Sequence, residues 1–567
     1  MGLVIPTAIG ALALLLLYHH VLYPALISPL RKLPAAHWTC HFSSIWILAA
    51  RLYRRENRSL HEAHIKLGPV VRIGPAEVSV DGVEGMRVIY QGGFEKGFWY
   101  SVFSNYGVPN MFSTGSSKHH SARKRMVANV YSKSYLQSSQ ASKAQMTHIV
   151  FQRLLPALSG RSSKDKLASS SSENVTTAAH ADVEVFGLFL ALAMDVITAY
   201  LFGLSNGTDF IQDEQYRQSW QEMYLARANY PFWTQEVPNL TAACARWLPW
   251  LRLYPKWVDE SNAKLSQWNL NLCQGVTKNA EKDTTQGQSH QVKSSTEPCE
   301  EPVVFNALQY GIDRELRTNG EKSILYKTSI CERELAVASE LMDHSLAGHE
   351  TTGMVLTYAT WHLSRSPDLQ EQLRSEIISI GSSLKLRRSS TAEVNSSGNT
   401  TSGPSLPDLK ALDALPLLNA IVMETLRLHA PIPGPQPRDT PKDGCNIAGY
   451  HIPGGVRIAS MAYSLHRDPK VFPQPESWNP ERWLLRDGMD AETSHREMHR
   501  QFWAFGSGGR MCVGSNFALN EMKVILAAIY ANFRTTVVND DGIEQEDAYT
   551  ARPVGEQLVL RFHTLKI

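Results

Sequence analysis

The chain has 567 residues, of which 43% are hydrophobic and 19% charged, a composition typical of a globular protein with a large core. Its 56 Lys and Arg residues nearly balance its 54 Asp and Glu residues, and the formal net charge of +2 argues against nucleic acid as a partner and against a strongly charged substrate. The seven cysteines are odd in number and include no Cys-x-x-Cys pair, so we expect a reduced body that faces the cytosol.

The N-terminal segment predicts a membrane anchor. The first 30 residues contain no Asp, Glu, Lys or Arg, and residues 12–17 are all Leu or Ala, so the run is long enough to span a bilayer. Its first charges, Arg31 and Lys32, follow the apolar run, whereas a cleaved signal peptide carries positive charge before it. We therefore predict a transmembrane anchor over residues 1–28 with the body in the cytoplasm. A signal peptide and a peripheral helix remain alternatives, because two histidines and a proline weaken the second half of the span.

A stiff hinge rich in proline and basic residues follows at 29–37, and we expect one catalytic domain over 38–567. Within this domain, three stretches are too polar and too rich in serine to build a core. We predict mobile surface insertions there, at 159–180, 278–303 and 381–406.

The patterned sequence of the body is mostly helical. Apolar residues recur at spacings of three and four over 334–363 and 409–428, which predicts helices packed on one another. Residues 69–80 predict two short strands broken at Gly-Pro, and residues 447–459 predict a similar hairpin broken at Gly-Gly. The expected fold class is therefore mainly α with a small β part.

The segment 505–514 reads Phe-Gly-Ser-Gly-Gly-Arg-Met-Cys-Val-Gly and carries the strongest chemical signal. A single cysteine such as Cys512 is more often a small buried hydrophobe than a metal ligand. Here, however, the surrounding glycines let the backbone turn sharply and approach a flat cofactor closely. Arg510, two residues earlier, could form a charge-assisted bond to a carboxylate on the edge of that cofactor.

This segment resembles the haem-binding signature of cytochromes P450, Phe-x-x-Gly-x-Arg-x-Cys-x-Gly, at every fixed position. The matching residues are Phe505, Gly508, Arg510, Cys512 and Gly514. The resemblance implies the cytochrome P450 fold, with haem b (iron protoporphyrin IX) as the cofactor and Cys512 as the axial ligand of its iron.

A second motif, Ala-Gly-His-Glu-Thr-Thr, occupies residues 347–352 inside the apolar helical stretch. Taken alone, an acid beside a threonine is more often a solvated or capping acid with a β-branched neighbour. Beside the cysteine motif it resembles the oxygen-activating segment of the family. The resemblance implies that Thr351 hydrogen-bonds dioxygen, that Glu350 helps relay protons, and that Gly348 leaves room for dioxygen because it has no side chain. We expect His349 to be structural.

A third motif, Glu424-x-x-Arg427, alone indicates only a weak salt bridge on a helix surface. It aligns with the Glu-x-x-Arg motif of the family, and Pro480-Glu-Arg482-Trp resembles the segment that supplies its third partner. The resemblance implies that Glu424, Arg427 and Arg482 together lock the loop beneath the haem, a structural role.

The resemblance also suggests cations for the haem propionates. Arg438, which follows the Glu-x-x-Arg helix, matches a usual propionate contact of the family. His120 and Lys124 replace the Trp and Arg of a family motif on an earlier basic helix, which keeps hydrogen bonding and charge but loses the fork geometry of arginine. The alternative is that this basic run is a solvated helix face.

The motifs occur in the family order from about residue 30 to the end of the chain, with spacers and a hinge like those of fungal microsomal members. We therefore expect a monooxygenase that inserts oxygen from O2 into a hydrophobic small molecule, plausibly in fungal secondary metabolism. The expected location is the endoplasmic reticulum membrane, with a single span. No flavin or nicotinamide fingerprint is visible, so electrons are expected from an NADPH-cytochrome P450 reductase.

The segments that line the substrate site in this family are rich in aromatic residues here, which suits a lipophilic substrate. They comprise Phe98, Trp99, Tyr100, Phe103 and Tyr106, then residues 233–257, and then residues 432–434. Two other functions remain open: a haem-thiolate isomerase or dehydratase that needs no reductase, and a non-enzymatic haem sensor or carrier. Glu350 and Thr351 argue against both, because neither function needs a proton relay.

Overall fold

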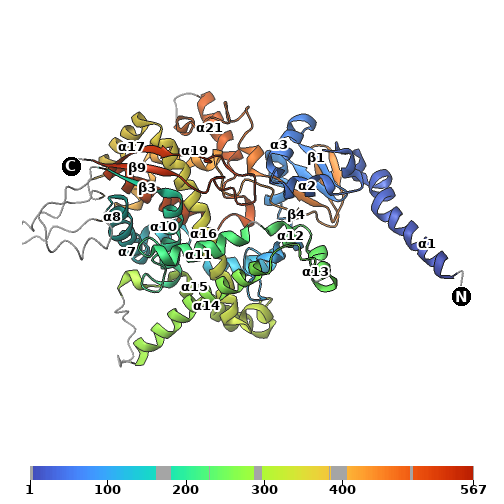
Figure 1. The fold of residues 1–567 in the computed structure, drawn as a ribbon, viewed down its shortest axis with the longest axis horizontal. Coiled ribbons are helices and arrows are strands. Elements are labelled where there is room, and N and C mark those ends of the chain that lie inside the picture. The colour runs from blue at the N-terminus through green and yellow to red at the C-terminus, as the bar shows by residue number, and fades with distance from the viewer. Residues whose placement is uncertain are drawn as a thin grey trace, which may run out of the picture.

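The computed structural model describes residues 4–160, 180–228, 230–248, 250–285, 297–381, 384, 405–484 and 489–565. Helices make up most of the body, and three small sheets complete it, as the fold-class prediction required (Figure 1). The three predicted polar insertions lie largely outside the described residues. At the edge of one of them, residues 278–285 continue helix α14 (Lys256–Thr285).

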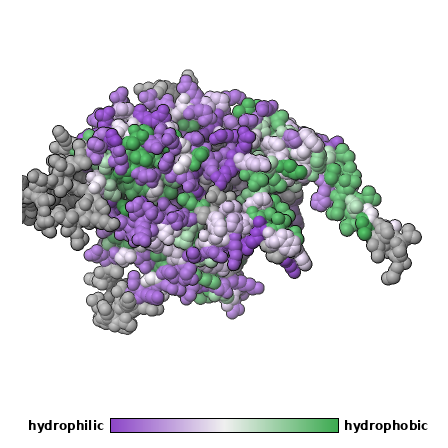
Figure 2. All heavy atoms as spheres, in the orientation of Figure 1, coloured by the Kyte–Doolittle hydropathy of each residue, from purple (hydrophilic) through white to green (hydrophobic). Residues whose placement is uncertain are grey.

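The N-terminal helix stands apart from the body. Helix α1 (Val4–Leu17) continues into η1 (Tyr18–Ile27), and Figure 1 shows it projecting away from the other elements. Its described side chains are almost all exposed although they are apolar (Figure 2), and Ile9–Ile27 is long and apolar enough to cross a membrane. The hinge joins this helix to the body, where Leu30 and Leu33 are buried against the first sheet.

Two helices form the centre of the body. Helix α10 (Val185–Phe202) is apolar all round and is buried on every side, as such a composition requires. It packs along α16 (Arg333–Ser364), which confirms the predicted helix over 334–363. Glycines on α16 permit this close packing, because a Cβ at Gly348 would lie 2.8 Å from the Ile197 side chain and a Cβ at Gly353 would lie 2.8 Å from that of Leu190. Gly348 therefore faces α10, and the expectation that it leaves room for dioxygen is wrong.

Other helices surround this pair. The longer ones are α3 (Glu56–Leu67), α5 (Ser117–Val127), α7 (Gln140–His148), α11 (Glu214–Ala228), α13 (Pro238–Trp247), α14, α15 (Val303–Asn319), α17 (Pro367–Ser379), α19 (Pro416–Leu428), α21 (Met489–Gln501) and α22 (Ser515–Asn532). The shorter ones are α2 (Ile45–Leu52), α4 (Val83–Met86), α6 (Lys133–Ser138), α8 (Leu155–Leu158), α12 (Pro231–Gln235), α18 (Leu409–Asp413) and α20 (Ala462–Leu465). The stretch predicted as helical over 409–428 is split between α18 and α19, because Pro416 is tolerated at the first turn of a helix but not in its interior.

The largest sheet has the order β1-β2-β7-β4 and lies at the end of the body nearest α1 (Figure 1). The strands are β1 (Val70–Gly74), β2 (Glu77–Val80), β4 (Arg438–Asp439) and β7 (Arg457–Ala459). The antiparallel pairing of β1 with β2 confirms the strands predicted over 69–80, and β7 runs parallel to β2 with Glu77 opposite Arg457. A second sheet has the order β3-β9-β8, formed by β3 (His180–Glu184), β8 (Phe533–Asn539) and β9 (Val559–Thr564).

The hairpin predicted over 447–459 is wrong. Its turn lies earlier, at Ala448 and Gly449, which both have positive φ, so that β5 (Cys445–Ile447) pairs with β6 (Tyr450–Ile452). After Gly454 and Gly455 the chain leaves this hairpin and enters the four-stranded sheet as β7. One partner of β7 is β4, and the other, β2, lies almost 400 residues earlier in the chain, so the local pattern could not reveal it.

Candidate active site

The cysteine loop, residues 505–514, depends on a left-handed glycine. Gly508 has φ +72°, and a Cβ at this position would lie 2.2 Å from the carbonyl oxygen of Tyr90. The backbone N–H of Cys512 donates to the carbonyl of Phe505 at 2.9 Å, which closes the loop. Gly514 then leads directly into α22. The glycines thus allow close approach to the neighbouring chain as well as the sharp turn itself.

Cys512 lies at the wall of an internal hollow. Its side chain is exposed to solvent, yet burial raises the pKa of its thiol because protein surrounds it. A side chain that is surrounded by protein and still accessible to solvent must face a space inside the protein. A thiol with a raised pKa stays protonated at neutral pH, and a coordinated metal ion is the agent that would deprotonate it.

Helix α16 supplies another wall of this hollow. Its residues 341, 342, 344 and 345 are buried, whereas Asp343, Ala347 and Thr351 are accessible. Residues spaced by four lie on one face of a helix, so these three line a single accessible strip. The charge of Asp343 also raises the pKa of Cys512, which requires the two side chains to be near each other. The Thr351 hydroxyl, Oγ1, donates to the carbonyl of Ala347 at 2.7 Å.

A cluster of basic side chains meets beside the hollow. Its members are Lys96, His120, Lys124, Arg438 and Arg510. Burial and the nearby positive charges lower the pKa of His120 to about 3 and that of Arg510 to about 10. The pKa of Lys96 is also held well below its usual value by burial, by Arg438 and by Arg510, although Asp343 opposes this shift. Positive charge is therefore in excess in this part of the interior, and a bound anion would relieve the repulsion.

Three members of the basic cluster hydrogen-bond to neighbouring parts of the chain. Arg438 donates to the Tyr100 hydroxyl at 2.9 Å, and Arg510 donates to the carbonyl of Thr114 at 2.7 Å. Lys124 donates to the Gly509 carbonyl at 3.0 Å and so contacts the cysteine loop itself. The helix face that carries His120 and Lys124 is therefore turned inward and is not simply solvated.

Lys96 was not predicted. It is 8% exposed, donates to the carbonyl of Phe112 at 2.6 Å, and lies 4.0 Å from the centre of the Tyr100 ring and 3.8 Å from that of Phe112. It belongs to no family motif quoted above. Its only sequence signal is a lone cation just before the aromatic run at residues 98–103.

The residues around the hollow fit a haem. A haem needs a ligand for its iron and cations for its two propionate carboxylates, and the hollow offers an accessible thiol beside a cluster with excess positive charge. The accessible strip of α16 leaves one helix face open to the same space.

The Glu-x-x-Arg motif and Arg482 come together as expected. Arg427 donates to both oxygens of Glu424 at 2.9 Å, and Arg482 donates to Glu424 Oε1 at 3.0 Å. Trp483 adds an indole N–H to Glu424 Oε2 at 2.9 Å. The Glu424 and Arg427 side chains are fully buried, so the loss of one partner would leave an uncompensated charge in the interior.

Hydrogen bonds connect this buried triad to the cysteine loop. Arg427 donates to the carbonyl of His466 at 2.9 Å, and His466 Nε2 accepts the backbone N–H of Trp503 at 2.8 Å. Trp503 lies two residues before the loop begins, and its carbonyl accepts the N–H of Gly506 at 3.0 Å. The triad is therefore placed to support the loop.

Glu350 is held from two sides. Its Oε1 accepts a hydrogen bond from Arg552 Nε, and its Oε2 accepts one from the Tyr224 hydroxyl at 2.6 Å. All three side chains are buried. His349, the neighbour predicted to be structural, is 1% exposed and packs edge-on against the Tyr224 and Trp220 rings. The partners of Glu350 lie 126 and 202 residues away in the chain, so no local motif could indicate them.

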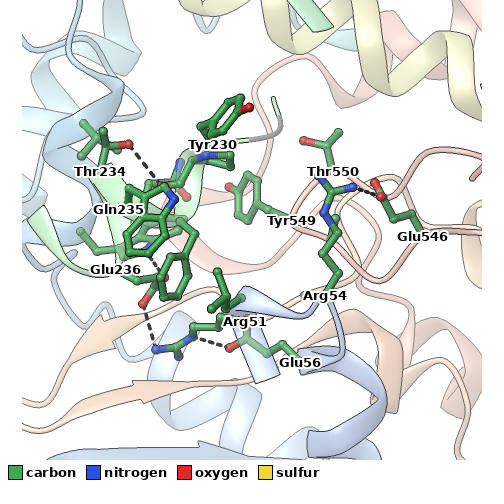
Figure 3. A pocket seen from close by; sticks show the side chains of 18 of the residues that line it. Arg51, Arg54, Glu56, Tyr230, Thr234, Gln235, Glu236, Glu546, Tyr549 and Thr550 are labelled. Carbon is green, nitrogen blue, oxygen red and sulfur yellow. Dashed lines mark hydrogen bonds and ion pairs between the residues drawn. The ribbon is translucent and has the colours of Figure 1, made fainter. Parts of the chain in front are cut away.

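A cavity of about 410 Å³ adjoins this group, and Glu350, Tyr224 and Arg552 are part of its wall. Figure 3 shows Arg51 between Glu56 and Glu236 on one side of the cavity, and Arg54 with Glu546 on another. Of the predicted aromatic segments, Trp99, Phe103, Trp233 and Gly434 line this cavity. The expectation of an apolar wall is wrong in part, because paired charges share the wall with the aromatic rings.

Other predicted lining residues lie elsewhere. Tyr100 is fully buried against Arg438, and the Tyr106 hydroxyl donates to the Ser266 carbonyl at 2.8 Å. Phe98 is 74% exposed and Trp250 is 80% exposed, so both lie on the outer surface.

Comparison with known proteins gives a consistent result. The family model described as Cytochrome P450 matches residues 332–558. Among curated proteins, the chain is 26% identical to Cytochrome P450 monooxygenase avaI of Aspergillus versicolor, over 82% of this chain and 94% of the relative. It is 24% identical to Cytochrome P450 monooxygenase FGM1 of Gibberella zeae, over 99% of this chain and 96% of the relative. Together with the cysteine loop, the buried triad and the helical fold described above, these matches identify residues 332–558 as a cytochrome P450 domain, and the relatives align with most of the chain.

Proposed function

We propose that this enzyme is a haem-thiolate monooxygenase that inserts one oxygen atom of O2 into a lipophilic small molecule, by hydroxylation, epoxidation or multistep oxidation. The observation that carries the proposal is that the accessible Cys512 lies close to Asp343, which shares one accessible face of α16 with Thr351. When it is bound, a haem with a thiolate ligand supplies the electronic push that favours cleavage of the O–O bond.

In this proposal the chain holds haem b in three ways. Cys512 would ligate the haem iron, and Phe505, Gly508 and Gly514 would shape the loop around it. Arg438, Arg510, His120 and Lys124 bind or orient the propionates, and we add Lys96 because it shares their excess of positive charge. Glu424, Arg427 and Arg482 support the loop without touching the cofactor.

We assign Glu350 and Thr351 to proton transfer. The Glu350 carboxylate, at the wall of the cavity, accepts a proton from water. The Thr351 hydroxyl stands on the strip that faces the hollow, where it can pass a proton onward from Oγ1. Glu350 beside the cavity and Thr351 beside the hollow are thus each proposed to act in acid–base chemistry.

The setting of the reaction follows from the relatives and the N-terminal helix. The relatives quoted above are named monooxygenases of filamentous fungi, which supports a tailoring step in fungal secondary metabolism. We propose residues 1–28 as a single membrane span, residues 29–37 as the hinge, and residues 38–567 as a cytoplasmic domain at the endoplasmic reticulum. Electrons would come from NADPH-cytochrome P450 reductase. The exposed Trp247 and Trp250 suit contact with the bilayer interface.

The test is reconstitution of the purified enzyme with a fungal P450 reductase, NADPH and a panel of lipophilic metabolites under oxygen-18 gas. Incorporation of a single labelled atom into a product supports the proposal, and turnover that needs neither NADPH nor O2 points to the isomerase or dehydratase instead. Thr351→Ala should release most of the reducing equivalents as hydrogen peroxide, because the hydroxyl that passes protons is gone. The matched control is Thr352→Ala, which removes the neighbouring buried hydroxyl. Unchanged coupling in Thr351→Ala contradicts the role assigned to Thr351.

A further inference from the structure

Glu350 is clamped by residues from two distant parts of the chain. Tyr224 lies on α11, and Arg552 lies in the segment between β8 and β9, yet both hydrogen-bond to the carboxylate. Glu350 is 5% exposed, Tyr224 is 7% exposed and Arg552 is 8% exposed. A buried carboxylate without a partner would be costly to keep ionised, and the two donors remove that cost.

The partners of Glu350 are themselves held in place. The Tyr224 ring stacks on Trp220, with the ring planes 13° apart and the ring centres 5.1 Å apart. Arg552 donates a second hydrogen bond, from Nη1 to Glu556 Oε1 at 2.8 Å, and the Glu556 side chain is 43% exposed. Burial is the largest single effect and lowers the pKa of Arg552, but the charges of Glu350 and Tyr224 and the hydrogen bonds to Glu350 and Glu556 together outweigh it and hold this pKa above its usual value. The clamp therefore contains an ionised arginine and leaves little freedom to the carboxylate.

The clamp lies where the cavity meets the central helix. Glu350, Tyr224, Arg552 and Glu556 all line the cavity of about 410 Å³. Thr351, the next residue along the chain, belongs to the strip of α16 that borders the hollow with Cys512. Glu350 thus lines the cavity, and its neighbour in the sequence carries a hydroxyl on the accessible face of α16.

We propose that Arg552 and Tyr224 are positioning residues that hold the Glu350 carboxylate ionised and oriented between the cavity and Thr351. In each transfer, Glu350 accepts a proton from cavity water and releases it to Thr351 Oγ1. The hydroxyl proton of Thr351 is taken up by the O2 that electrons from the reductase reduce, so both groups return to their starting state. This inference rests on the proposed monooxygenase function for its consequence, but the clamp can be tested without turnover.

The first experiment measures proton binding directly. Infrared spectra of the holoenzyme are recorded as a function of pH, and the carboxylic acid C=O band of Glu350 is identified by its loss in Glu350→Gln. In Arg552→Met this band should appear at a higher pH than in the wild type, because the positive charge that favours the carboxylate is gone. Arg552→Lys should restore most of the wild-type behaviour. A Glu350 band that titrates identically in wild type and Arg552→Met overturns the inference.

The second experiment follows the consequence. The holoenzyme oxidises NADPH through its reductase, and the fraction of electrons recovered as hydrogen peroxide is measured from acidic to alkaline pH, with no substrate needed. Arg552→Met should raise the ratio of peroxide to water roughly tenfold, since a misplaced proton donor loses part of its contribution. Tyr224→Phe should raise this ratio less, and Arg552→Lys should lower it again. The control is Arg561→Met, which removes an exposed arginine paired with Asp182.

The two measurements separate the possible failures. A purely structural clamp would lower the unfolding temperature of Arg552→Met and leave the pH profile of the peroxide fraction unchanged, which contradicts positioning. If Glu350→Gln itself leaves the peroxide fraction unchanged, the proton role in the proposed function fails, whereas the infrared titration still decides whether Arg552 sets the charge of Glu350. Because Tyr224→Phe removes only one hydroxyl, it keeps the test valid if Arg552→Met folds poorly.

Discussion

Glu340 places another carboxyl group in the interior, on α16 about one turn before the accessible strip begins at Asp343. It is 3% exposed, and its two oxygens accept the backbone N–H of Met111 at 3.0 and 2.9 Å. Burial raises its pKa to about 8, although the charge of Arg123 opposes the shift. Asp343 adds to the increase, and the His344 imidazole lies 3.8 Å away. Glu340 therefore joins the loop that ends in Phe112 to α16 mainly as a neutral acid.

This raised pKa has a consequence for stability. A group whose pKa is higher in the folded state contributes stability below its usual pKa of 4.5, and that contribution is lost as the pH rises to about 8. Relative to Glu340→Gln, the wild type should lose stability over this window, by at most about 1.4 kcal/mol per pH unit. Thermal unfolding of both proteins at a series of pH values measures the difference. A gap between wild type and variant that stays constant across the window contradicts the raised pKa.

Residues inside contiguous motifs could be predicted, and residues that reach the site by tertiary folding could not. Cys512, Glu350 and Thr351 stand in short signatures, so the sequence alone singled them out. Lys96 and Arg552 are isolated basic residues in the sequence. Their roles become visible only in the fold, which brings Lys96 to the hollow and Arg552 to the Glu350 carboxylate. Gly348 shows the converse, since its motif suggested space for dioxygen whereas its contact with Ile197 shows a packing role.

At the scale of elements, an ionic network fastens α12 and α13 to the four-stranded sheet. Glu236, between these two helices, pairs with Arg51 at 2.9 Å and with Arg457 at 3.2 Å, and it accepts the Trp99 indole N–H at 2.6 Å. Both arginines also pair with Glu77 on β2. Figure 3 shows the Arg51 and Glu236 part of this network at the wall of the cavity. The network therefore holds the two short helices down at one border of the cavity.

Glu236→Gln should loosen these helices. Loss of the charge removes two ion pairs that are mostly buried, which costs roughly 1.5–3 kcal/mol for hydrogen bonds to a charged group. Amide hydrogen exchange over residues 231–247 should accelerate about tenfold or more, while exchange in α16 stays slow. The matched control is Glu546→Gln, which breaks the more exposed Arg54 pair at the same cavity. Equal exchange in wild type and Glu236→Gln contradicts a fastening role.

Elements with strong local periodicity were predictable, and strand partners were not. The spacing of apolar residues predicted α16 almost to its ends, because a long buried helix repeats its pattern over many turns. The strand β7 is only three residues long, and its partners β2 and β4 lie on other segments, so the sequence suggested a local hairpin instead. The split between α18 and α19 was visible in principle, since Pro416 begins a helix.

For the whole molecule, a formal net charge of +2 conceals a strongly uneven distribution. Basic side chains lie so close together beside the hollow that they lower one another's pKa, whereas the cavity wall carries pairs of opposite charge. The overall composition argues against nucleic acid as a partner but does not reveal this internal cluster. The apolar N-terminal helix could be predicted from the local sequence, whereas the space beside Cys512 depends on how α16 and the cysteine loop come together.

The central claim is that Cys512 is the thiolate ligand of a haem in this hollow. The most direct measurement is the absorption spectrum of the purified, dithionite-reduced protein under carbon monoxide, for wild type, for Cys512→Ala and for Cys331→Ala as an exposed-cysteine control. We predict a strongly red-shifted Soret band in the wild type and in Cys331→Ala that is lost in Cys512→Ala. A folded, haem-loaded wild type without this band, or a band that survives in Cys512→Ala, would contradict thiolate ligation by Cys512.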